Sequence, residues 1–189
     1  MRCYLLRCEL KTTASLDDAF RVFENPYNLA AITPPWLDFK ILDKGLEMKQ
    51  GLVINYRIRW QGLPMRWQTI ITDYQPPYRF VDFQSKGPYV LWHHTHLFQP
   101  VANGTIVADE VRYVLPLGPL GALAHKWMVK NQLLEIFRYR QSKIGEMLGG
   151  VIESRPPTIE ETSPVSKEKL ADYRAHQSHR PAPDQQFAK

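Results

Sequence analysis

Three histidines lie within four positions of one segment, LWHHTHLF, which covers residues 91 to 98. His93, His94 and His96 carry imidazoles, which can bind a metal ion, transfer protons near neutral pH, or hydrogen-bond a ligand. Trp92 and Phe98 bracket them with aromatic surface. The segment therefore raises three alternatives: a metal site, a catalytic centre, or a polar spot in the wall of an apolar cavity.

A turn signal indicates which of these histidines share a face. Asn103-Gly104 is typical of a tight hairpin turn, and a hairpin closed around it pairs residues whose numbers sum to about 205. His96 then lies opposite Asp109, and His93 falls on the other face, where its cross-strand neighbour is polar. One face of this hairpin is predicted to carry Trp92, His94, His96, Phe98, Val107, Asp109, Val111 and Tyr113. We therefore expect His94 and His96 to point inward and His93 to point outward.

An aromatic face with two imidazoles and a carboxylate is typical of a cavity rather than of a solid core. Each buried polar group costs a few kcal/mol unless it is hydrogen-bonded, whereas a cavity open to ligand or water accepts it. Neighbouring segments alternate in the same way, although the direction of Asp82 relative to the cavity is undetermined. The predicted lining comprises Tyr56, Trp67, Thr69, Asp82, Trp92, His94, His96, Phe98, Asp109, Val111, Tyr113 and Trp127.

The elements that must position these residues follow from periodicity and turn signals. A first strand over residues 2 to 10 precedes a helix capped by Ser15 and a second short helix that stops before TPPW. Hairpin-length separators then divide six segments rich in β-branched and aromatic residues, which predicts antiparallel pairing. These strands are expected at residues 37–43, 51–61, 65–74, 79–84, 89–100 and 104–115.

A long amphipathic helix ends the ordered part of the predicted fold. Its apolar stripe is predicted to contain Leu123, Trp127, Leu134, Phe137, Ile144 and Leu148. Arg138 and Arg140 are predicted on its solvated face, with contact to an anionic ligand head as the alternative. The layout is α+β: a seven-stranded antiparallel sheet wrapped around the C-terminal helix, with two short helices between strands 1 and 2.

The chain divides into a folded domain, residues 1–148, and a polar, proline-rich tail, residues 149–189. The tail offers too little apolar surface to offset the entropy of ordering, so we predict disorder with a transient helix near residues 166 to 176. A protein partner that binds through this tail is one hypothesis for its role.

Composition excludes several classes of protein. No run of about 18 apolar residues occurs, and Arg2, Arg7 and Glu9 interrupt the first segment, which predicts no membrane insertion and no export. Cys3 and Cys8 lie five residues apart on a strand, so we expect free thiols and a cytoplasmic location. The formal charge of +5 is spread over single residues, which argues against nucleic-acid binding.

The chain resembles the ligand-binding SRPBCC proteins. The segments that carry the likeness are NPYNLAAITPPWLDFKI, GLVINYRIRWQGLPMRWQTII, PPYRFVDFQSKGPYVLWHHTHLF, GTIVADEVRYVLPLGPLG and QLLEIFRYRQ, within residues 1 to about 148. These proteins belong to the START-like, birch-pollen-allergen-like superfamily, which includes polyketide cyclase/dehydrases. The resemblance implies a helix-grip fold with a deep hydrophobic cavity, and it implies no single reaction.

The sequence leaves three functional hypotheses. The first is binding of a hydrophobic small molecule (a lipid, isoprenoid or polyketide-like compound), with His94, His96 and Asp109 as polar anchors and no cofactor or metal. The second is a cyclase- or dehydratase-type enzyme in which His96 and Asp109 act as general acid and base. The third is an interaction module that acts through the tail. Metal binding by His94 and His96, with Asp109 as third ligand, is a weaker alternative.

Overall fold

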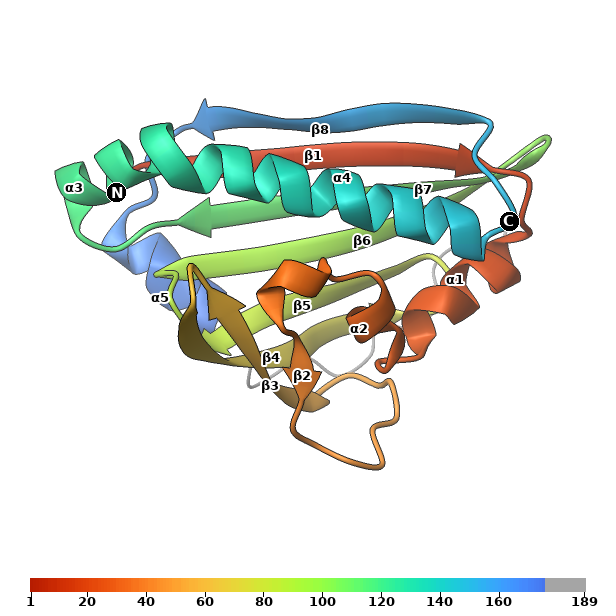
Figure 1. Ribbon diagram of the computed structural model, residues 1–189, viewed down its shortest axis with the longest axis horizontal. Helices are drawn as coiled ribbons and strands as arrows, with labels where there is room; N and C mark the ends of the chain where they lie inside the picture. The colour runs from red at the N-terminus through yellow and green to blue at the C-terminus, as the bar shows by residue number, and fades with distance from the viewer. Residues whose placement is uncertain (176–189) are drawn as a thin grey trace.

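One antiparallel sheet forms the centre of the molecule. The computed structural model describes residues 1–175, and its eight strands lie in the order β2-β3-β4-β5-β6-β7-β1-β8 (Figure 1). The strands are β1 (Cys3–Thr12), β2 (Lys40–Ile41), β3 (Val53–Trp60), β4 (Leu63–Gln75), β5 (Arg79–Lys86), β6 (Leu91–Val101), β7 (Gly104–Val114) and β8 (Glu153–Thr162). Every pair of neighbouring strands is antiparallel, as the hairpin-length separators predict.

The helices fall into three groups around this sheet. Two short helices, α1 (Leu16–Glu24) and α2 (Asn28–Ala31), separate β1 from β2 together with a 3-10 turn at Pro35–Leu37. Helix α3 (Gly118–Ala124), a π-helical turn (His125–Val129) and α4 (Lys130–Met147) follow β7, and α4 runs along one face of the sheet (Figure 1). Helix α5 (Lys167–Ala175) comes last. The predicted α+β, helix-grip architecture is confirmed. No helix within residues 1–175 is long and apolar enough to cross a membrane.

The hairpin of β6 and β7 has the predicted register. Phe98 pairs with Val107, His96 with Asp109 and Trp92 with Tyr113. The turn itself depends on Gly104, whose φ is +130° and where a Cβ atom would lie 1.8 Å from the carbonyl oxygen of Thr12. A side chain at this position would therefore collide with β1, so glycine sets the turn and the turn sets the register.

The sheet has an eighth strand, and the prediction of disorder from residue 149 onward is wrong for Glu153–Thr162. These residues form β8 and pair with β1 from Cys3 opposite Thr162 to Lys11 opposite Glu153. Most side chains of β8 are exposed, so hydrogen bonding to an otherwise open edge orders the strand rather than apolar burial. The prediction of disorder relied on the low apolar content of this segment, which does not reflect backbone hydrogen bonding to β1.

Ordered structure continues beyond β8. The helix expected near residues 166–176 corresponds to α5, and Leu170 packs with Phe83, Leu91 and Val165 in a core cluster. Residue 176 and the rest of the tail to residue 189 lie outside the described residues. Interaction with a partner through the tail remains a prediction.

The second strand is shorter than predicted. Residues 37–43 were expected as a strand, but only Lys40–Ile41 pair with β3. The 3-10 turn takes Leu37, and Asp38 follows with φ at +41°, which is incompatible with an extended strand. The TPPW segment therefore ends in a turn that leads into a minimal edge strand.

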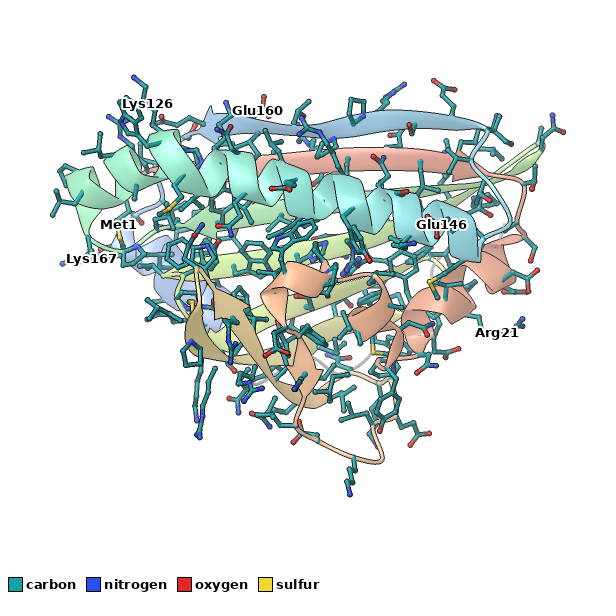
Figure 2. All side chains as sticks on the ribbon, viewed as in Figure 1. Met1, Arg21, Lys126, Glu146, Glu160 and Lys167 are labelled. Carbon is teal, nitrogen blue, oxygen red and sulfur yellow. The ribbon has the colours of Figure 1, made fainter. Side chains whose placement is uncertain are left out.

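The buried residues of the long helical segment from α3 to α4 differ from those predicted for its apolar stripe. Leu123 and Trp127 are exposed (55% and 74%), and Leu133 is buried where Leu134 was expected. The π-helical turn explains the exposure of Leu123 and Trp127. Its i→i+5 bonding adds one residue to a turn and so rotates α3 relative to α4. His125 consequently faces the sheet, whereas Lys126 projects outward (Figure 2).

The buried His125 makes the fold sensitive to acid. Burial is the main cause that lowers its pKa to about 4, Lys130 lowers it further, and Glu161 raises it. Its neutral Nε2 lies 2.8 Å from the Tyr113 hydroxyl, which donates the hydrogen bond, and its ring stacks on Tyr4 with centroids 3.6 Å apart. Between the ordinary pKa of about 6.5 and the lowered value, the unfolded chain binds a proton that the folded chain does not.

We expect His125→Gln to flatten the pH dependence of stability between pH 6.5 and 4. Glutamine keeps an acceptor for Tyr113 and does not titrate, so it removes this contribution to the fall in stability with falling pH. Urea denaturation at four or five pH values measures the slope for the wild type and the variant. An unchanged slope in the variant would show that other groups cause the acid sensitivity.

Candidate functional site

A cavity of about 460 Å³ lies between the concave face of the sheet and the helices. One side of β3 lines it with Ile54, Tyr56, Ile58 and Trp60. Helix α4 contributes apolar side chains from the opposite wall, and α1, α2, α3 and the 3-10 turn surround the rest. Further lining residues include Phe23, Leu29, Leu37, Trp67, Ile71, Phe80, Tyr89, Trp92, Leu120, Met128, Val129, Leu133, Ile136 and Phe137.

A group of ionisable side chains interrupts the mainly apolar wall on the side of the sheet. Asp82 on β5 and both His94 and His96 on β6 line the cavity. The two strands are neighbours, and Asp82 pairs directly with His94. The side chain of Asp82 keeps 19% of its surface exposed, whereas those of His94 and His96 keep 6% and 2%. The strand register therefore presents a carboxylate at the cavity surface with two imidazoles directly behind it.

The four ring nitrogens of these imidazoles all face carboxylate oxygens. Asp82 Oδ2 lies 3.1 Å from His94 Nδ1 and 2.9 Å from His96 Nε2. Asp109 Oδ1 lies 3.1 Å from His94 Nε2 and 2.7 Å from His96 Nδ1. The last contact is close but not aligned as a hydrogen bond, so His96 Nδ1 has no hydrogen-bond partner. We call these four residues the Asp–His cluster.

Arg140 of α4 lies beneath the Asp–His cluster, on the side of Asp109. Its Nε is 3.4 Å from Asp109 Oδ2, and both side chains are almost completely buried. The guanidinium also lies 5.6 Å from the ring centre of Phe23. Asp109 thus lies behind the two imidazoles, whereas Arg140 both contacts Asp109 and lines the cavity from the side of α4.

Charge compensation governs protonation in the cluster. Burial opposes ionisation of Asp109, but Arg140 and the two imidazoles outweigh it and hold its pKa well below the usual range. Burial also raises the pKa of Asp82, yet His94 and His96 lower it overall. Burial lowers the pKa of His94, but Asp82 and Asp109 raise it by more, so the pKa of His94 lies above its usual value.

Seven of the residues predicted to line the cavity do so: Tyr56, Trp67, Thr69, Asp82, Trp92, His94 and His96. The side chain of Asp82, whose direction the sequence left open, points toward the cavity. His93 lies on the opposite face as expected, but its ring packs 5.3 Å from that of Tyr173 on α5, so it is half-buried rather than open to water.

The other five predicted lining residues do not reach the cavity surface. Asp109 lies behind the imidazoles, and Val111 and Tyr113 are fully buried in the core. Phe98 packs against Phe20 and Phe23 of α1, which fill that end of the concave face. Trp127 points to solvent because of the π-helical turn. Sharing a strand face was therefore necessary for lining the cavity but not sufficient.

Arg140 is the site residue that was misassigned. It was predicted on a solvated helix face, and it is 8% exposed and paired with Asp109. Its position could have indicated this, because Leu133, Phe137, Arg140 and Ile144 follow the i, i+4, i+7, i+11 spacing of one helix face. A lone arginine on a buried stripe indicates a buried acid opposite.

Comparison with known proteins supports the fold alone. No family model matches the sequence, and no curated protein matches it. Among solved structures, protein TTHA0849 from Thermus thermophilus is similar with a TM-score of 0.60 and 18% identity, covering 76% of this chain and 96% of that one. Protein CV1439 from Chromobacterium violaceum has a TM-score of 0.59 and 14% identity, over 76% and 96% of the two chains.

A third similar structure is described as the di-domain ARO/CYC BexL from the BE-7585A biosynthetic pathway. Its TM-score is 0.58 at 16% identity, and the match covers 82% of this chain and 51% of BexL. These neighbours support the helix-grip fold. Identities this low carry no information about the ligand or the reaction.

The Arg140–Asp109 contact yields a stability prediction. Replacing Arg140 by methionine leaves the Asp109 carboxylate buried without its nearest cation, which is expected to lower the free energy of unfolding by about 3–5 kcal/mol. The matched control is Arg138→Met, an exposed position on the same helix, for which we expect a change within about 0.5 kcal/mol. Chemical denaturation measures both, and equal effects would contradict the buried pairing.

Proposed function

We propose that the protein binds a hydrophobic small molecule, such as a lipid, isoprenoid or polyketide-like compound, in the cavity between sheet and α4. The observation that carries the proposal is a mainly apolar cavity with the buried Asp–His cluster in the wall formed by the sheet. Its volume of about 460 Å³ falls within the range of roughly 300–1,000 Å³ that is usual for small-molecule sites. The resemblance to ligand-binding SRPBCC proteins points to the same role.

The polar cluster limits which ligand atoms fit beside it. Because all four imidazole nitrogens face carboxylate oxygens, the imidazoles have little capacity left to donate to a ligand. Asp82 alone combines a carboxylate with partial exposure to the cavity. A hydroxyl on an otherwise apolar ligand would therefore donate to Asp82.

Filling the cavity tests this proposal. Ile136→Trp adds bulk to a lining position of α4 and is expected to weaken binding of the uncharged apolar probe N-phenyl-1-naphthylamine by about tenfold or more. Glu135→Trp adds the same side chain at the exposed neighbouring position and should leave the affinity unchanged. Fluorescence titration of the full chain, after extraction of any co-purified molecule, gives both values.

Native mass spectrometry of the unextracted protein provides the second measurement. A bound small molecule retained by the wild type and by Glu135→Trp, but lost from Ile136→Trp, would support the proposal. Equal probe affinity in all three proteins would place the probe outside the cavity and contradict it.

A cyclase- or dehydratase-type enzyme is the second candidate, favoured by the contact between His96 and two carboxylates at the cavity wall. Asp82 is the member of the cluster that a bound chain can reach, and a proton passed to Asp82 would be relayed to His96, whose Nε2 lies 2.9 Å from Asp82 Oδ2. The acid–base group is then the four-residue Asp–His cluster rather than the His96–Asp109 pair alone. The similar fold of BexL is consistent with this candidate.

Loss of turnover without loss of binding separates the enzyme from the binder. With a linear polyketide-like substrate and product analysis by mass spectrometry, His96→Gln is expected to lower the rate by about 10²–10⁴-fold while probe affinity stays unchanged. His93→Gln, on the opposite face of β6, serves as the matched control. Turnover by His96→Gln at the wild-type rate would exclude His96 as the acid–base group.

A further inference from the structure

We propose that Asp82, His94 and His96 bind a divalent first-row transition metal ion, with Asp109 as the carboxylate that orients both imidazoles. The inference uses the same cavity wall as the proposed function but does not require its apolar ligand. It differs from the metal alternative in the sequence, where Asp109 was the third ligand. Strand β5, whose direction was undetermined there, supplies the third ligand instead.

The three ligand atoms already lie at coordination spacing. Asp82 Oδ2, His94 Nδ1 and His96 Nε2 all lie within 4.8 Å of one another. The two distances from the carboxylate oxygen are 3.1 and 2.9 Å. In the tetrahedral geometry usual for Zn²⁺, ligand atoms about 2.0–2.2 Å from the metal lie about 3.3–3.6 Å from one another, so the main movement needed is withdrawal of the Asp82 carboxylate.

The cavity provides the space that such a rearrangement requires. Asp82 Oδ2 now occupies the point that both imidazole nitrogens face, which is the point where an ion would lie. Asp82 borders the cavity and is partly exposed, so its carboxylate can withdraw toward the open volume and remain a ligand. The remaining coordination positions would then face the cavity, where an oxygen atom of a water molecule or ligand can fill them.

The outer contacts match those of metal-binding histidines. Ligating imidazoles generally donate their second ring N–H to a carboxylate or carbonyl, which fixes the tautomer and the ring orientation. Here the second nitrogen of each ring lies against one atom, Asp109 Oδ1, at 3.1 Å for His94 and 2.7 Å for His96. Arg140 in turn holds Asp109 from behind.

Among the described residues, two buried side-chain atoms have no hydrogen-bond partner, His96 Nδ1 and Arg140 Nε, and the first of them belongs to the proposed site. His96 is 2% exposed, and its Nδ1 has no aligned partner although Asp109 Oδ1 is close. A ring that served only to bridge two aspartates would be expected to satisfy both nitrogens. Rotation of His96 toward an ion at the Asp82 side would give Nδ1 the freedom to align with Asp109.

The donor set selects the class of metal. Two imidazoles and one carboxylate suit Zn²⁺, Fe²⁺ or Co²⁺, whereas Mg²⁺ and Ca²⁺ prefer oxygen ligands and Cu⁺ prefers thiolates. The nearest thiol, Cys8 Sγ, lies 3.9 Å from Asp109 Oδ2, on the orienting carboxylate rather than on a ligand. Open positions beside three protein ligands are the arrangement of reactive rather than structural sites.

The test is a metal titration of the full chain after tag removal and chelator treatment. Calorimetry with ZnCl₂ is expected to show one equivalent bound by the wild type, and CoCl₂ should give visible absorption bands that Zn²⁺ displaces. Asp82→Asn and His94→Gln are each expected to weaken Zn²⁺ binding by at least about tenfold. Asp109→Asn is expected to weaken it about 10–100-fold with unchanged stoichiometry.

Matched controls separate this site from the other histidines of the chain. His93→Gln alters the opposite face of β6, and a His176→Gln/His179→Gln double variant alters histidines outside the described residues; both should bind Zn²⁺ as the wild type does. Absence of stoichiometric binding by the wild type would overturn the proposal. So would binding that survives both Asp82→Asn and His94→Gln, or that a control variant removes.

The outcome is independent of the apolar-probe experiment. Metal binding without probe binding would support the metal site and contradict the proposed function. Probe binding without metal binding would support the proposed function and contradict the metal site. Circular dichroism of each variant establishes that it is folded before titration, and the wild-type measurement decides the proposal even where a variant does not fold.

Discussion

The buried charge of Asp109 is the constraint on which the site depends. A carboxylate removed from water is stable only beside compensating charge, and two imidazoles from β6 and one guanidinium from α4 provide it. Arg140 thereby joins the C-terminal helix to the centre of the sheet through an ionic contact, in addition to apolar packing. Asp82 is then the carboxylate of the cluster that meets the cavity.

The concave face of the sheet is filled at one end and open at the other. Phe20 and Phe23 of α1 pack against Phe80 and Phe98, so the end near the β6–β7 turn is solid core. Toward α3 and the π-helical turn, the helix and β3 enclose space instead. An asymmetric cavity of this kind places the Asp–His cluster at the boundary between packed aromatic core and accessible volume, where a ligand or an ion can reach it.

Local signals in the sequence were sufficient for much of this arrangement. The Asn103-Gly104 turn determined the register of β6 and β7, and the period-2 alternation of residues 54 to 60 identified a cavity-facing strand. Trp127 was misplaced because the π-helical turn changes the phase of the helix before α4. Arg140 shares the spacing of the buried stripe, but the acid that makes its burial favourable lies on β7 and is not a local property. Strand β8 was missed because edge pairing depends on where β1 lies in the sheet.

The sequence by itself determined the fold class, the antiparallel order of the hairpins and the inward direction of His94 and His96, because turns and alternation act between neighbouring residues. Only the tertiary structure decided that Asp82, rather than Asp109, meets the cavity and that Arg140 neutralises Asp109. These contacts join β5, β6, β7 and α4, which approach one another only when the sheet closes around its helix. The physical reason is that compensation of a buried charge depends on distance in space and not on separation along the chain.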